Sequence, residues 1–100
     1  MDTIYLVECF WPGATHAVVR AAVERARDSA RTQSGEGVAV VFVGSMLVPA
    51  DEVVFFQFVA ASEEDVTRTA RAAGLPFDRV SASLWLEPPA VDWTEETSCD

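Results

Sequence analysis

Four segments with strand character alternate with two helical segments, and this order limits the possible folds more than any other feature of the chain. Residues 3–10, 38–47, 53–60 and 80–86 are rich in β-branched and aromatic residues, as is typical of strands. The segments after the first and third strands repeat small apolar residues at helical spacing. The βαββαβ order predicts a ferredoxin-like α+β sandwich, in which two helices cover one face of a four-stranded antiparallel sheet.

The ends of both predicted helices carry local signals. Thr15 is placed to cap the first helix, and Ser62 precedes three acidic residues that favour the start of the second. Gly74 should end the second helix because glycine adopts a positive φ at little cost, and Pro76 cannot continue it.

Length and charge restrict the class of protein. One hundred residues suffice for one domain with a single core, which we assign to residues 1–87, followed by an acidic, flexible tail over residues 88–100. The formal net charge of −9 argues against nucleic-acid binding because phosphates would be repelled. No apolar run reaches the length of a membrane span and no basic segment precedes the first apolar run, so we expect a cytoplasmic protein without membrane contact.

Both faces of the predicted sheet are apolar, although two helices can cover only one of them. In residues 53–60 (VVFFQFVA), apolar side chains fill both alternating sets, and Gln57 is the single polar break. An uncovered face of this kind requires a partner surface. We expect a homodimer that packs face to face around an apolar cavity; single exposed residues are the alternative.

Glu8 and His16 are the candidate catalytic residues. Glu8 falls in a strand expected at the centre of the sheet, where a carboxylate sharing a cavity with Gln57 can accept a proton or bind a ligand. The alternative is that Glu8 reaches solvent or pairs with an arginine such as Arg79. His16 is the only histidine, and a neutral imidazole can accept a proton or bind a metal. A solvated side chain at the helix start is the alternative.

Other residues are candidates for cavity walls and for metal ligation. The aromatic residues would suit an aromatic or polyketide-like ligand, unless they simply form the core. The candidate metal ligands are His16, Glu8 and Cys9. Because Glu8 and Cys9 are strand neighbours, they should point to opposite faces, so a metal site would need donors from a second copy or from the tail. The candidate ligand-pocket residues are Phe10, Trp11, Met46, Phe56, Gln57, Phe58, Ser83 and Trp85.

Five short segments, most of them around the predicted turns, together form a sequence pattern that can be compared with known protein families. They are residues 5–8 (YLVE), 12–13 (PG), 43–45 (VGS), 48–52 (VPADE) and 72–80 (AAGLPFDRV).

With this pattern the chain resembles DUF4242, a family of small bacterial proteins of which one branch is described as nickel-binding. The resemblance implies a ferredoxin-like fold paired into a dimeric α+β barrel, and nickel as a possible cofactor. Many relatives carry cysteines in the third strand, where this chain reads VFFQF over residues 54–58.

Two functions of different classes follow. The first is a homodimer that binds a small ligand, with a divalent metal such as nickel implied by the resemblance. The alternative is a cofactor-independent enzyme of specialised metabolism that uses the apolar cavity for proton transfer, isomerisation, cyclisation or oxygenation, with Glu8 or His16 as acid or base. A third interpretation is a structural dimer with a filled core.

Overall fold

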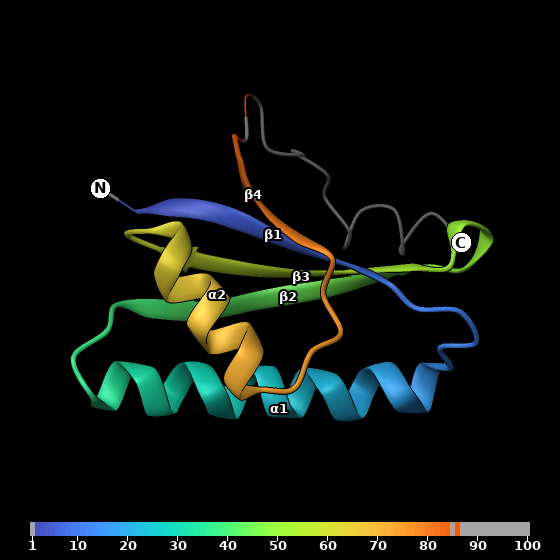
Figure 1. Cartoon of the computed structure of the whole chain (residues 1–100), viewed down its shortest axis with the longest axis horizontal. Helices are drawn as coiled ribbons and strands as arrows, with labels where there is room; N and C mark the ends of the chain where they lie inside the picture. Colours follow the sequence, from blue (N-terminus) through green and yellow to red (C-terminus); the bar gives the residue numbers. More distant parts are fainter. Residues whose placement is uncertain (1, 85, 87–100) are drawn as a thin grey trace, which may run out of the picture.

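The computed structural model describes residues 2–84 and 86, which form one sheet and two helices (Figure 1). The ferredoxin-like α+β fold predicted from the order of the segments is confirmed. The elements are β1 (Thr3–Phe10), α1 (His16–Gly35), β2 (Val40–Val48), a short 3-10 turn η1 (Pro49–Asp51), β3 (Val53–Ala60), α2 (Glu63–Ala72) and β4 (Arg79–Ser83).

The four strands form an antiparallel sheet in the order β2-β3-β1-β4, so β1 and β3 are central as expected. Both helices lie on the same side of this sheet (Figure 1). The opposite side, which we call the outer face, is covered by no described element. No helix in the part of the chain that the structure describes combines the length and the apolar character needed to cross a membrane.

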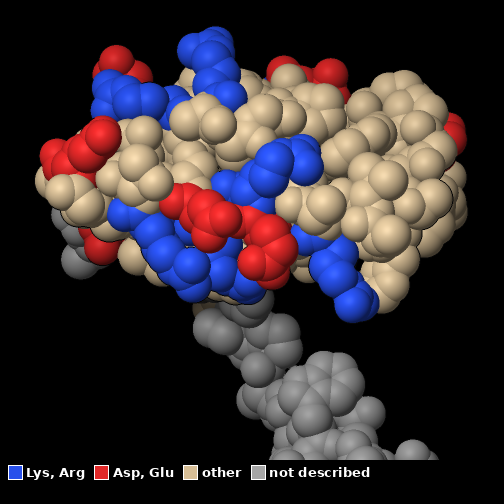
Figure 2. All heavy atoms as spheres, turned by 90° about the horizontal axis from the view of Figure 1, so that it is seen from below, with Lys and Arg blue, Asp and Glu red and all other residues tan. Residues whose placement is uncertain are grey.

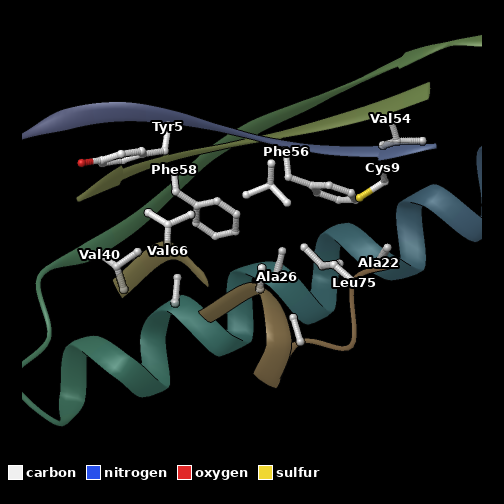
Figure 3. Close-up of a cluster of buried hydrophobic side chains, with 14 of the residues drawn as sticks. Tyr5, Cys9, Ala22, Ala26, Val40, Val54, Phe56, Phe58, Val66 and Leu75 are labelled. Atoms are coloured by element: carbon white, nitrogen blue, oxygen red, sulfur yellow. The ribbon is translucent and has the colours of Figure 1, made fainter. Parts of the chain in front are cut away.

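The core lies between the sheet and the helices (Figure 3). Successive side chains of a strand point to opposite faces, and in β3 every second residue is buried. Phe56 and Phe58 from β3 and Cys9 from β1 are fully buried. Ala22 and Ala26 of α1 are fully buried too, and their small side chains let the helix approach the sheet closely.

The helix ends follow the predicted signals. The hydroxyl of Thr15 accepts a hydrogen bond from the Val18 amide at 3.2 Å, and the hydroxyl of Ser62 caps α2 in the same way. After α2, Gly74 adopts a φ of 70°. The Leu75 amide then donates to the Ala70 carbonyl at 3.1 Å, which completes a Schellman motif and buries Leu75 under the turn.

The last strand is shorter than predicted. β4 ends at Ser83 rather than at residue 86, because Ser83 already pairs with Ile4, close to the first residue of β1. The sheet therefore offers almost no partner for further residues. A register shift interrupts β2 between Phe42 and Gly44, and a glycine inside a strand is a frequent position for such a bulge. The tail predicted over residues 88–100 lies outside the described residues.

Candidate functional site

The outer face carries most of the residues that the sequence singled out for function. Alternate residues of each strand point to this face, and the strand register places them in rows across the sheet. One row contains Ser81, Leu6, Gln57 and Gly44, and the next contains Arg79, Glu8, Phe55 and Met46. The other rows of the outer face include Ile4, Phe10, Val41, Val48, Val53, Val59 and Ser83.

Large apolar side chains of the outer face are accessible. Val41 is 59% exposed, Phe10 56% and Met46 52%. Between them, Val53, Phe55 and Val59 of β3 are partly exposed. On the helix-covered face, Phe56, Phe58 and Val54 of β3 are fully buried. Exposed apolar side chains gathered on one face in this way mark an interaction site rather than ordinary surface.

Glu8 forms an ion pair on this face. The Nε of Arg79 donates a hydrogen bond to Oε1 of Glu8 at 2.7 Å, between residues that are directly opposite in the β1–β4 ladder. The Glu8 side chain is 29% exposed and that of Arg79 is 71% exposed. This is the alternative arrangement that the sequence left open for Glu8. Because these are the two charged residues in the rows defined above, their charges cancel.

Gln57 shares the outer face with Glu8 but lies one row away, between Leu6 and Gly44. Among the described residues, its side-chain amide has no hydrogen-bonding partner. A Cβ atom built onto Gly44 would lie 4.0 Å from Oε1 of Gln57 and near no other atom. The amide therefore borders open space in apolar surroundings.

Four of the eight candidate pocket residues belong to the outer face: Phe10, Met46, Gln57 and Ser83. They are spread over it, since Ser83 pairs with Ile4 at one end of β1 and Phe10 is at the other end. The hydroxyl of Ser83 is already engaged, because it donates to the Ile4 carbonyl at 2.8 Å.

The other four candidates are placed differently. Phe56 and Phe58 are fully buried beneath the helices, so assigning them to the outer cavity needs correction. The reason is strand alternation: once Gln57 points outward, both of its neighbours must point inward. Trp11 is partly buried and packs against the core, and Trp85 lies outside the described residues.

Cys9 faces the helices, on the opposite side of the sheet from Glu8, and is fully buried. Burial, reinforced by the negative charges of Asp78 and Glu8, raises the pKa of the Cys9 thiol from 9.0 to about 12. The thiol therefore stays protonated at neutral pH, which makes it a poor nucleophile and a poor metal ligand.

His16 is the first residue of α1 and is exposed, on the helix-covered side of the sheet, whereas Glu8 points to the outer face. Its Nε2 lies 3.4 Å from a terminal nitrogen of Arg20. The two side chains border an open groove of about 370 Å³, which is also lined by Val19, Val23, Ser45 and Leu47. The structure thus separates the two candidate catalytic residues.

The candidate metal ligands are not brought together. No group of three or more His, Cys, Asp or Glu residues within the described ranges could hold a metal ion. Glu8, Cys9 and His16 occupy the outer face, the core and a helix start, respectively. The described donors of one chain therefore do not fit a divalent metal, and we derive no chemistry through one.

Sequence reasoning missed several residues of the outer face. Leu6, Val59 and Gly44 flank Gln57 there but were not among the candidate pocket residues. Period-two alternation from Glu8 and Gln57 would have found Leu6 and Val59. The bulge obscures Gly44, because it shifts the alternation of β2 by one residue.

Comparisons with known proteins show the fold alone. No protein-family model matches the chain, and no curated protein matches it. Its structure is similar to a crystal structure of SCO4226 from Streptomyces coelicolor A3(2), with a TM-score of 0.63 and 17% sequence identity. The match covers 88% of this chain and 99% of the other.

Proposed function

We propose that the chain forms a homodimer by packing two outer faces together, and that it binds a small, mainly apolar ligand between the two sheets. The observation that carries this proposal is the outer face itself, which is apolar and exposed beside a fully formed core on the other side of the sheet. A cofactor-independent enzyme remains an alternative without an observation that favours it.

Charge supports a second copy as the occupant of this face. Two chains of net charge −9 repel each other, and acidic and basic residues are scattered over the helical side of the molecule (Figure 2). The outer face has one positive and one negative residue, already paired with each other. It is therefore the surface on which two copies can approach with the least repulsion.

Symmetry supports it as well. A two-fold interface brings the same patch of both chains together, so the patch must complement itself. An apolar centre with a neutral ion pair toward the β4 edge meets this condition. Packed sheets stand about 10 Å apart, and among the described residues only the Gln57 Oε1 comes within 4 Å of a Cβ on Gly44, apart from its chain neighbours. The missing side chain of Gly44 therefore leaves room at this point between two packed sheets.

Sedimentation of the purified protein, with one variant on each side of the sheet, tests the dimer. Leu6→Glu places a charge at the centre of the outer face, whereas Ala21→Glu places the same charge on an exposed site of α1. We expect dimers for the wild type and Ala21→Glu, and a folded monomer for Leu6→Glu, with folding checked by circular dichroism. A monomeric wild type at tens of micromolar (about the range of transient dimers) would overturn the proposal.

Native mass spectrometry of the untagged protein from its own host tests the ligand. We expect a dimer with added mass of an organic molecule that is lost in Leu6→Glu. If the added mass is that of a metal ion, the proposed organic ligand is wrong, and the dimer binds a metal between its two copies instead. A dimer that binds no small apolar molecule at all would leave the structural interpretation in its place.

A further inference from the structure

The Gln57 side-chain amide would lose its access to water if a second copy covered the outer face. It carries two N–H donors and one carbonyl acceptor, and it has no hydrogen-bonding partner among the described residues. Its neighbours on this face, Leu6 across β1 and Phe55 and Val59 along β3, offer only apolar atoms. Burying an amide without a partner is costly.

The chain keeps space beside this amide. Gly44 is the residue of β2 opposite Gln57, and apart from its chain neighbours a Cβ there would have only the Gln57 Oε1 within 4 Å. Gly44 is not among the glycines with positive φ, so its backbone does not require glycine. What the missing side chain provides at this position is room next to the amide.

Charge restricts what can occupy that room. The two charged residues of the outer face bond to each other at 2.7 Å, one row away from Gln57. A ligand with a net charge would therefore lie against apolar side chains without a free counterion, at a high desolvation cost.

We infer that the ligand is an uncharged, mainly apolar molecule with a hydroxyl or carbonyl oxygen, and that Gln57 binds this oxygen over Gly44. This inference rests on the proposed function and adds the class of ligand and the residue that recognises it. The Gln57 side chain can donate to a carbonyl, or donate to and accept from a hydroxyl, so either oxygen satisfies the amide that dimerisation removes from water.

Two probes of similar shape test the inference: 2-naphthol, which carries a hydroxyl, and 2-methylnaphthalene, which carries a methyl group in its place. Fluorescence titration gives the Kd of each for the wild type, Gln57→Leu and Gln57→Met. We expect the ratio of the two Kd values to shift against 2-naphthol by about three- to tenfold in both variants, the loss of one hydrogen bond. The second variant guards against a folding defect in the first.

Gly44 variants test the position of the site. Gly44→Ala should leave both Kd values within about twofold, because its Cβ makes an ordinary contact at 4.0 Å. Gly44→Val should weaken both probes by tenfold or more, since its larger side chain fills the space. Sedimentation of every variant reports whether the dimer persists.

The outcomes separate this inference from the proposed function. If both probes bind the dimer and the Kd ratio is the same in the wild type and the Gln57 variants, the inference is wrong and the proposed function stands. If both probes bind Gly44→Val as tightly as the wild type, the site lies elsewhere on the dimer and the inference is also wrong. If neither probe binds a wild-type dimer, the inference and the ligand-binding part of the proposed function are wrong, and the dimer stands. If the wild type is a monomer, the inference and the whole proposed function are wrong.

Discussion

The Nε of Arg79 lies 2.7 Å from Oε1 of Glu8 and joins the first residue of β4 to the central strand β1 on the outer face. A second hydrogen bond lies next to this pair. The amide of Asp78, the residue before β4, donates to the Glu8 carbonyl at 2.7 Å. The side chain of Asp78 in turn accepts from the Phe10 amide. Glu8, which lies in a mainly apolar face, is thus paired within its own chain.

The first prediction concerns the strength of this ion pair. Because Arg79 is 71% exposed, solvent screens the pair, and a double-mutant cycle with Glu8→Gln and Arg79→Gln should give a coupling energy below about 1 kcal/mol in dilute protein. Urea unfolding at 0.1 M and 1 M salt measures it, and the coupling should shrink at the higher salt concentration. A coupling of several kcal/mol that resists salt would contradict an exposed pair.

The second prediction concerns Gly74, which has a φ of 70° after α2. Gly74→Ala should lower the free energy of unfolding by about 1 kcal/mol, because a Cβ is strained in this conformation. Gly35→Ala is the matched control. Gly35 closes α1 without a positive φ, and nothing lies within 4 Å of an added Cβ, so this change should be neutral or slightly stabilising. Equal effects of the two substitutions would refute the argument.

The third prediction follows from the buried Cys9 thiol, whose pKa is raised to about 12. Between pH 9 and pH 12 the unfolded chain loses this proton while the folded chain keeps it, so the free energy of unfolding falls as the pH rises. The steepest slope is about 1.4 kcal/mol per pH unit. Urea unfolding of the Cys99→Ser and Cys9→Ala/Cys99→Ser proteins at pH 8, 9 and 10 isolates the contribution of Cys9. Parallel pH profiles would exclude it.

The sequence predicted the architecture because local and long-range signals agree along most of the chain. The bounds of β1 and β3 were predicted to the residue, since apolar runs between turn signals define them on both sides. Thr15, Ser62 and Gly74 act at the helix ends as expected. β4 was predicted too long because its end depends on the length of its partner β1, which local composition does not report.

The site was predicted less completely for two physical reasons. Either of the two alternating sets of side chains in a strand can point to the outer face. The sequence did not indicate whether the set with Gln57 or the set with Phe56 does so. The choice is decided by which set the helices bury. The bond between Glu8 and Arg79 also depends on a register between residues that are 71 positions apart in the chain.

The last prediction compares neighbours on the two faces of β3. Phe56 is fully buried and Phe55 is half-buried on the outer face. Phe56→Ala should lower the free energy of unfolding by about 3–5 kcal/mol, through lost burial and the cavity left behind. Phe55→Ala should change the stability of the isolated chain by about 1 kcal/mol but weaken the proposed dimer at least tenfold, because that ring belongs to the interface. Chemical denaturation at high dilution measures the first effect and sedimentation at several concentrations the second. If Phe55→Ala destabilises the chain as much as Phe56→Ala and leaves its association unchanged, the outer face is not where two copies meet.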